Sequence, residues 1–254
     1  MPILPLRAGP FELVWGRRTY VMGIVNVSPD SFAGDALSTS REAIDQGLRF
    51  VAEGADLLDV GGESTRPGGS PVAPDAEIRR VVPVIEGLSA ASVPISVDTS
   101  KAVVARAALA AGACLVNDVT GLLGDPAIAG VVAEARAGAV AMANHRLALP
   151  TGAARRTIVD RTLARWAASL QIADRAGLPR AQVILDPGLG FGLRPASSLA
   201  LLRHLPDLRR LGHPLLVGPS RKGFIGEALG GLPVEERLEG TLAAVALAIA
   251  DGAD

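Results

Sequence analysis

The chain has 254 residues, 49% of them hydrophobic, and a chain of this length and composition can bury one substantial core. Its 25 basic and 26 acidic side chains leave a formal net charge of −1, which disfavours nucleic acid and anionic membranes as partners. The sequence offers neither a run of about 18 apolar residues nor the long apolar stretch of an export signal. We therefore expect one cytoplasmic domain over residues 1–254.

Short aliphatic runs alternate along the chain with longer segments of helical periodicity, a pattern typical of repeated βα units. The predicted strands are Tyr20–Val25, Leu57–Val60, Pro94–Val97, Leu115–Val119, Gly138–Met142, Val183–Leu185 and Pro214–Val217. The predicted helices are Ser40–Glu53, Asp75–Leu88, Lys101–Ala110, Pro126–Ala135, Thr157–Ala176, Ser198–Leu208 and Val234–Ala250. Because the strands are apolar throughout, both faces must be covered, and seven βα units favour an α/β TIM (β/α)₈ barrel over a doubly wound sheet.

Two features concern the ends of this predicted barrel. Phe11–Trp15 suggests one arm of a small hairpin that could plug its N-terminal end. The residues 252–254, Gly-Ala-Asp, repeat the residues 54–56 that precede the second strand. We therefore expect the eighth strand to be missing from this chain, which would then be C-terminally truncated, because an open barrel exposes strand edges that favour aggregation.

Polar residues follow nearly every predicted strand, at the end where TIM barrels carry their active sites. They are Asn26, Asp59, Asp98, Asn117, Asp118 and Asp186, with Lys222 after the last strand. Any one of them could simply cap a loop, but several carboxylates and amides at one mouth would be poorly solvated without a ligand or cation. The set predicts a binding site, and a carboxylate such as Asp186 suits a heterocycle edge with two N–H donors.

Two loops are suited to bind an anion. The segment Gly218–Gly223 follows the last predicted strand and should open a helix, the usual place for a phosphate in this fold. The glycine-rich segment Gly61–Gly68 carries Arg66. Oxygen ligands for Mg²⁺ are available in the first loop, from Asn26, Asp30 and Asp35. A magnesium-bound phosphorylated substrate fits these features.

Catalysis through a nucleophilic triad is not indicated. His204 and His213 are expected to be structural residues in a helix and the following turn. Cys114 is the sole cysteine, which excludes an internal disulfide and a cysteine-based zinc cluster. We expect its side chain to be buried as a small apolar group.

Six stretches over nearly the whole chain resemble the dihydropteroate synthase family of pterin-binding enzymes. They are MGIVNVSPDSF at 22–32, GADLLDVGGESTRPG at 54–68, ISVDTSKAVVARAALAAGA at 95–113, VNDVTG at 116–121, ILDPGLGFG at 184–192 and LVGPSRKGFIG at 216–226. The resemblance implies a homodimeric TIM-barrel transferase with Mg²⁺ as cofactor. Such an enzyme joins 4-aminobenzoate to dihydropterin-CH₂-pyrophosphate in folate synthesis and releases pyrophosphate.

The resemblance also implies roles for individual residues. Those expected to contact substrate are Asn26, Asp59, Thr65, Arg66, Asp98, Asn117, Met142, Asp186, Phe191, Gly218 and Lys222. Catalytic roles are implied for Arg66, Asp98, Asp186 and Lys222, and a magnesium ligand for Asn26. Thr65 and Arg66 match a mobile loop, while Phe32 and Phe191 match the walls of the aminobenzoate pocket.

The sequence departs from the family pattern after the fifth predicted strand. There Met-His-x-Arg-Gly is replaced by residues 142–147, Met-Ala-Asn-His-Arg-Leu, which leaves the role of His145 open. Gly223 stands where a serine often follows the lysine, and the family's Arg-x-His anion site belongs to the eighth strand. Two alternatives follow. One is a homologue that binds pterin without catalysis, which the altered motif favours; the other is a folate-dependent methyltransferase, which the Ser-Thr-Arg-Pro-Gly loop at 64–68 argues against.

Overall fold

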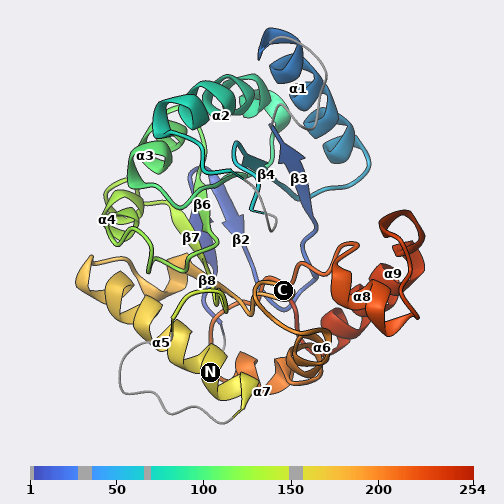
Figure 1. The fold of residues 1–254 in the computed structure, drawn as a ribbon. Helices are drawn as coiled ribbons and strands as arrows, with labels where there is room; N and C mark the ends of the chain where they lie inside the picture. Colours follow the sequence, from blue (N-terminus) through green and yellow to red (C-terminus); the bar gives the residue numbers. More distant parts are fainter. Residues whose placement is uncertain (1–2, 28–35, 66–69, 149–156) are drawn as a thin grey trace.

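The computed structural model of the protein describes residues 3–27, 36–65, 70–148 and 157–254. Within them, six parallel strands pair in chain order: β3 (Met22–Asn26), β4 (Leu57–Gly61), β5 (Ile95–Asp98), β6 (Leu115–Asp118), β7 (Gly138–Met142) and β8 (Val183–Asp186). The helices are α1 (Ala36–Ala52), α2 (Pro74–Leu88), α3 (Ala102–Ala110), α4 (Ala127–Glu134), α5 (Ile158–Arg175), α6 (Pro195–Arg203), α7 (Leu205–Arg209), α8 (Gly223–Ala228) and α9 (Leu238–Ala250). Figure 1 shows the helices as an outer ring around the strands, the arrangement expected of a TIM barrel.

The core consists mainly of aliphatic side chains, as the low aromatic content of 3% requires, with Trp166 and Phe224 as its buried aromatic residues. Leu58 and Val60 of β4 and Val97 of β5 are completely buried. The covering helices bury one stripe each, since α2 buries residues at positions 81, 84, 85 and 88, the spacing of one helical face. Helix α2 begins with Pro74 and has two acidic residues in its first turn, both of which favour a helix start there.

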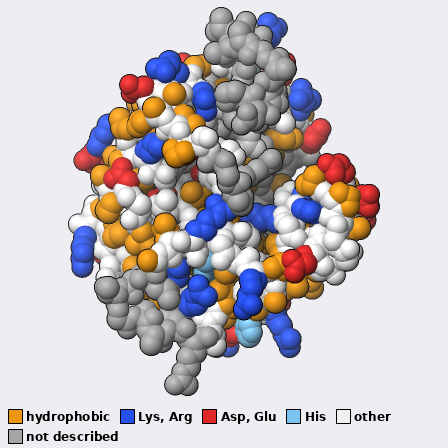
Figure 2. Space-filling model, in the orientation of Figure 1, with side chains coloured by type: hydrophobic (Ala, Val, Ile, Leu, Met, Phe, Trp, Pro, Cys, Tyr) orange, Lys and Arg blue, Asp and Glu red, His pale blue; other side chains and the backbone are white. Residues whose placement is uncertain are grey.

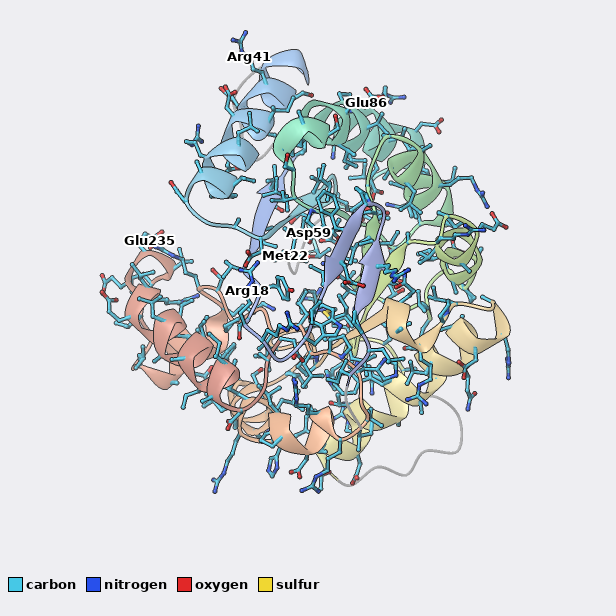
Figure 3. The ribbon with its side chains drawn as sticks, turned by 180° about the vertical axis from the view of Figure 1, so that it is seen from behind. Arg18, Met22, Arg41, Asp59, Glu86 and Glu235 are labelled. Atoms are coloured by element: carbon cyan, nitrogen blue, oxygen red, sulfur yellow. The ribbon has the colours of Figure 1, made fainter. Side chains whose placement is uncertain are left out.

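The predicted N-terminal hairpin is confirmed. Strands β1 (Leu6–Ala8) and β2 (Phe11–Leu13) are antiparallel and are joined by a turn in which Gly9 adopts a positive φ of 58°. Their apolar side chains share a second hydrophobic cluster with Leu57, Cys114 and Ile184, which lie at the beginnings of the barrel strands. The hairpin therefore closes the N-terminal end of the barrel, the end seen from behind in Figure 3.

The seventh predicted strand, Pro214–Val217, is reduced to a single bridge between Leu185 and Leu215. Two backbone hydrogen bonds support it, from Leu185 N to Pro214 O at 2.9 Å and from Leu216 N to Leu185 O at 3.0 Å. The (β/α)₈ barrel prediction is thus confirmed in architecture, but the sheet of the described residues has six strands and does not close.

The open side of the barrel lies between β3 and the segment 214–217, which do not pair directly with each other. Asp254 lies between them: its N–H donates to Leu215 O at 3.0 Å, and its carbonyl accepts from Tyr20 N at 2.7 Å. The expectation of an eighth strand stays a prediction.

Two helix predictions were wrong in detail. The single helix predicted over Ser198–Leu208 is divided into α6 and α7 at His204, whose φ and ψ of −101° and 14° are not helical. Pro206 explains the break, because proline lacks the N–H that a continuous helix would need. The helix predicted from Val234 begins as a 3₁₀ turn (Val234–Glu236), with α9 following. Among the described residues, no helix is both long and apolar enough to cross a membrane.

Candidate active site

The carboxyl ends of the first four barrel strands bring polar residues into one row. Strand register places Asn26 opposite Gly61, Gly61 opposite Asp98, and Asp98 opposite Asn117. A methyl group at Gly61 would lie 3.6 Å from Asp98 Oδ2 and 3.8 Å from Asn26 Oδ1. The two side chains therefore approach the same space, which Gly61 leaves open.

Asp59 lies one layer deeper than this row. Its side chain is 2% exposed, and Asn117 Nδ2 donates to its Oδ2 at 2.8 Å. Its Oδ1 is buried and makes no hydrogen bond of standard geometry to the described residues. The Ser96 hydroxyl, opposite Asp59 in the strand register, is the nearby donor that lowers the Asp59 pKa. Asp59 is labelled in Figure 3, near the centre of the molecule and within the surrounding helices.

Asp59, Asp98 and Asp186, hereafter the mouth carboxyls, all have pKa values above the usual range. Burial is the main cause for each. The Asn117 hydrogen bond lowers the pKa of Asp59 in part, whereas the negative charge of Asp59 raises the pKa of Asp98 further. A ligand that donates hydrogen bonds to these groups would favour their charged forms and so lower their pKa values.

Asp186 ends β8, opposite Met142 of β7. Its Oδ1 accepts from Gly188 N at 2.7 Å, and its backbone carbonyl accepts from Trp166 Nε1 at 3.2 Å. The positive charge of Lys222 partly offsets the rise that burial causes in the Asp186 pKa. Asp186 is thus fixed from two sides and paired electrostatically with Lys222.

Lys222 and Phe191 lie next to each other, and Lys222 is close enough to Asp186 to lower its pKa. Lys222 Nζ donates to Leu189 O at 2.7 Å and lies 4.7 Å from the centre of the Phe191 ring. The Arg146 guanidinium lies 5.1 Å from the same ring, so the ring contacts two cations. Burial lowers the Lys222 pKa, Asp186 opposes that effect, and Arg146 adds to it.

A pocket of about 220 Å³ opens beside these groups. Its lining is Glu63, Ser64, Thr65, Glu77, Asp98, Thr99, Ser100, Val119, Asn144, Arg146 and Phe191. Figure 2 shows basic side chains near the centre of the face it displays, while the described lining itself carries the carboxyl groups of Glu63, Glu77 and Asp98 and the guanidinium of Arg146. The pocket brings the predicted residues Thr65, Asp98 and Phe191 together.

Other predicted site residues take different positions. Met142 is buried at the end of β7, and Gly218 faces Lys222, since a methyl group there would lie 3.9 Å from Nζ. Asp118, in contrast, caps its own loop: its oxygens accept from Thr120 N and Leu122 N, both at 2.7 Å. Asp118 is therefore structural. Four predicted residues lie outside the described part of the chain: Asp30, Phe32, Asp35 and Arg66.

His145, whose role the sequence left open, is a buried structural residue. Its Nε2 contacts Pro187 O at 3.2 Å and Thr162 Oγ1 at 3.4 Å. Burial lowers its pKa to about 4, so the ring is neutral near pH 7. The adjacent Arg146, rather than His145, reaches the pocket.

Sequence reasoning did not identify Arg146, Glu63 or Glu77 as pocket residues. The only signal for Glu63 in the sequence was its place in the glycine-rich loop. The only signal for Glu77 was its place as an acidic residue in the first turn of a predicted helix. The signal for Arg146 was its place in the altered motif after β7. Their shared position depends on contacts between loops far apart in sequence, which no local pattern encodes.

The candidate magnesium ligand Asn26 has an exposed side chain. Among the described residues, no three His, Cys, Asp or Glu side chains are grouped so that they could hold a metal ion by themselves. Mg²⁺ commonly takes only one or two protein oxygens and completes its shell with water and substrate phosphates. The single accessible amide of Asn26 fits that mode of binding.

Comparison with known proteins agrees with this geometry. The model of the pterin binding enzyme family matches residues 22–254. The dihydropteroate synthase of Synechocystis sp. is 43% identical over 98% of this chain and 88% of its own length. The inactive dihydropteroate synthase 2 of Mycobacterium bovis is 45% identical over 94% of this chain and 78% of its own length. The solved structure of Xanthomonas albilineans dihydropteroate synthase with 4-aminobenzoic acid is 43% identical and has a TM-score of 0.88, covering 98% of this chain and 90% of that one.

Proposed function

The chain belongs to the pterin-binding enzyme family, and on that premise we propose that it is a dihydropteroate synthase. The enzyme joins 4-aminobenzoate to (7,8-dihydropterin-6-yl)methyl diphosphate and gives 7,8-dihydropteroate and diphosphate. The observation that carries the proposal is the convergence of the mouth carboxyls, Asn117 and Lys222 at one end of the barrel.

The pterin ring is the part of the substrate that the mouth carboxyls recognise. Its amine and amide edge presents N–H donors, which carboxylate oxygens accept in pairs. Asp186 keeps Oδ2 for this edge, because Oδ1 already accepts from Gly188. Lys222 supplies a cation with further N–H donors, which suit the ring carbonyl and nitrogens.

In the reaction, the aryl amine nitrogen forms a bond to the methylene carbon while the carbon–oxygen bond to diphosphate breaks. The electron pair of that bond leaves with diphosphate, and the new secondary amine loses a proton. Phe191 lies beside the pocket in a position to pack against the aryl ring. Arg66, Asp98, Asp186 and Lys222 are proposed to orient and stabilise the reacting groups.

Magnesium is the cofactor that the proposal includes. When bound, Mg²⁺ would stabilise the charge of the departing diphosphate. Asn26 would hold it through its amide oxygen, and its exposure at the strand end leaves room for the diphosphate oxygens.

The experiment that tests the function supplies the protein with magnesium and both substrates and measures diphosphate release. Omission of either 4-aminobenzoate or the pterin should abolish release. The absence of release from the complete mixture would contradict the proposal.

A second candidate is a homologue that binds pterin without turnover. It is favoured by the altered stretch after β7 and by the 45% identity to the inactive mycobacterial protein. Pterin binding measured by calorimetry, without diphosphate release, would identify it.

We also propose that the protein is a cytoplasmic homodimer. Helix α9 exposes Leu238, Leu242, Leu247 and Ile249, a concentration of apolar side chains that a second copy could cover. Light scattering should give the mass of a dimer at micromolar concentration. A monomer mass would contradict this part of the proposal.

A further inference from the structure

The segment Glu63–Thr65 connects the end of β4 to one wall of the pocket. All three of its residues line the pocket together with Asp98 and Phe191. Strand β4, which contains Asp59 and Gly61, ends just before this segment, with only Gly62 between them. The strand end proposed to face pterin and the pocket wall therefore belong to one continuous stretch of chain. Whatever holds Glu63–Thr65 in place therefore sets the width of the pocket.

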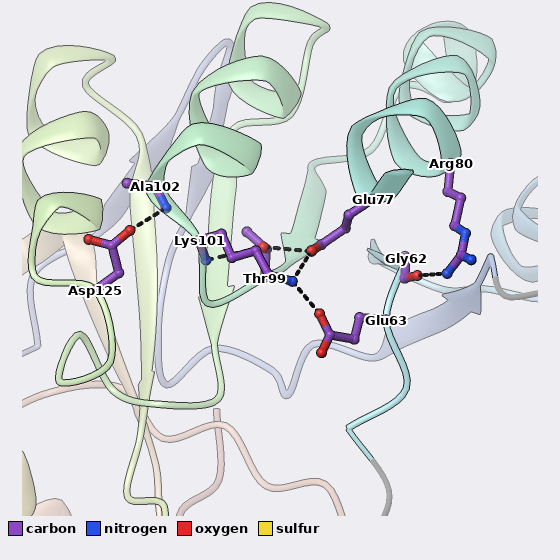
Figure 4. Close-up of polar contacts among 8 residues, drawn as sticks. All are labelled: Gly62, Glu63, Glu77, Arg80, Thr99, Lys101, Ala102 and Asp125. Atoms are coloured by element: carbon purple, nitrogen blue, oxygen red, sulfur yellow. Dashed lines mark hydrogen bonds and ion pairs between the residues drawn. The ribbon is translucent and has the colours of Figure 1, made fainter. Parts of the chain in front are cut away.

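Cations from neighbouring elements hold this stretch at several points. Lys101 Nζ forms an ion pair with Glu63, as drawn in Figure 4. Arg80 Nη1 of α2 donates to Gly62 O at 2.8 Å. On the far side, Arg146 Nη1 donates to Thr65 O at 3.0 Å. Of these three cations, Lys101 is the one with a buried second partner.

That second partner is Glu77, whose side chain is 1% exposed. Glu77 Oε1 accepts from Thr99 Oγ1 at 2.7 Å, while its Oε2 pairs with Lys101. Burial alone would lower the Lys101 pKa, but Glu63 and Glu77 outweigh that effect and raise it, so Lys101 stays charged. Thr99 immediately follows Asp98, so the network extends from the mouth carboxyls to Glu63.

Stability alone gives little reason for such a network. Burying the Glu77 carboxylate is expensive, and an ion pair such as Lys101–Glu63, whose side chains are 23% and 26% exposed, contributes little stability in return. What a charged cluster adds is a defined position for a loop side chain relative to the elements that the loop packs against, beside contacts such as the Arg80–Gly62 hydrogen bond. Here it joins the β4 loop, helix α2 and the β5–α3 connection.

We propose that Lys101 and Glu63 are positioning residues that hold Glu63–Thr65 against Asp98 so that the pocket accepts the carboxylate-bearing aryl amine in a reactive orientation. The proposal rests on the proposed function. Neither residue touches the reacting atoms, and both act through the pocket wall. Of the groups proposed to recognise pterin, Asp59, Asn117 and Asp186 lie outside this network and only Asp98 adjoins it, so pterin affinity should depend less on the pair than turnover of the aryl amine does.

Glu63→Gln is the informative variant, because Lys101 keeps its pair with Glu77 and no buried charge is left alone. We expect kcat/KM for 4-aminobenzoate to fall by about tenfold to a hundredfold, the size seen when a reacting group is misplaced. The dissociation constant for pterin and the thermal unfolding midpoint should stay close to those of the unchanged protein. Lys101→Arg should retain much of the activity that Lys101→Met loses.

The matched control is Glu134→Gln, which breaks the exposed ion pair between Arg106 of α3 and Glu134 of α4 at 2.8 Å. It should leave all three measurements unchanged. Unchanged kcat/KM in Glu63→Gln would overturn the proposal, as would an equal loss of pterin affinity or a large fall in the unfolding midpoint.

Failure of the proposed function can be distinguished from failure of this inference. If the unchanged protein has no turnover, the pair is tested by calorimetric titration of 4-aminobenzoate in the presence of pterin and diphosphate. Glu63→Gln should then weaken 4-aminobenzoate binding by about tenfold. Equal affinity in the two proteins would overturn the inference.

Discussion

Replacement of Asp186 by asparagine should separate pterin recognition from folding. The asparagine amide oxygen can still accept from Gly188 N, the contact that Asp186 Oδ1 makes at 2.7 Å. At the other position, the carboxylate oxygen becomes an NH₂ group. That group cannot accept from the pterin N–H edge, and it places a donor opposite donors.

The expected loss of affinity follows from the burial of this carboxyl group, which is 8% exposed. A hydrogen bond to a charged group contributes about 1.5–3 kcal/mol, and a buried donor left without an acceptor costs about 1–3 kcal/mol. We expect a net loss of about 2–4 kcal/mol, which weakens binding by roughly 30-fold to several hundredfold.

Calorimetric titration of a pterin ligand into the two proteins measures this loss. The neutral amide avoids the cost of burying a carboxylate but removes the charge that favours the protonated form of Lys222, so the unfolding midpoint is measured beside the affinity and should fall by less than the loss of binding requires. Asp207→Asn, on the exposed part of α7, serves as the control and should bind pterin normally. If Asp186→Asn binds pterin with an affinity within about threefold of the unchanged protein, the assignment of Asp186 is wrong.

Three further predictions follow from the site. Because the mouth carboxyls have raised pKa values when folded, the ligand-free protein should lose stability as pH rises through those values, and pterin should counteract the loss. A ligand-induced shift in unfolding midpoint that did not grow with pH would contradict this. Gly192→Ala should destabilise the protein more than Gly177→Ala in urea unfolding: both glycines have φ of 72°, but only the first would bring Cβ within 2.6 Å of Arg146 N. The positive φ strains alanine at either position by about 1–3 kcal/mol. Equal losses of stability in the two variants would show that the close contact at residue 192 has no effect. Asn26→Ala should raise the magnesium concentration that gives half-maximal turnover while pterin affinity stays the same, and an unchanged magnesium dependence would refute the role of Asn26.

The residues at the mouth of the barrel could be predicted from the sequence, because parallel barrel strands place their carboxyl ends at one mouth. That rule was sufficient for Asp59, Asp98, Asn117 and Asp186. It was not sufficient to separate Asn117 from Asp118. Successive strand residues point to opposite faces, so only one of this pair could face the mouth. The hydrogen bonds of Asp118 to its own loop decided which.

The contacts that shape the pocket wall could not be predicted in the same way. Lys101 and Glu63 are 38 positions apart, and Arg146 and Thr65 are 81 apart. These pairs form because different βα connections meet above the barrel, and their meeting depends on loop conformation rather than on periodicity. The division of α6 from α7 at His204, by comparison, could have been predicted from Pro206.

The measurement that tests the central claim most directly is the stoichiometry of a complete reaction. The protein is incubated with magnesium, 4-aminobenzoate and (7,8-dihydropterin-6-yl)methyl diphosphate, and 7,8-dihydropteroate and diphosphate are quantified together. A dihydropteroate synthase forms the two products in equal amounts over many turnovers. Pterin that binds and is recovered unchanged, with neither product formed, would contradict the claim.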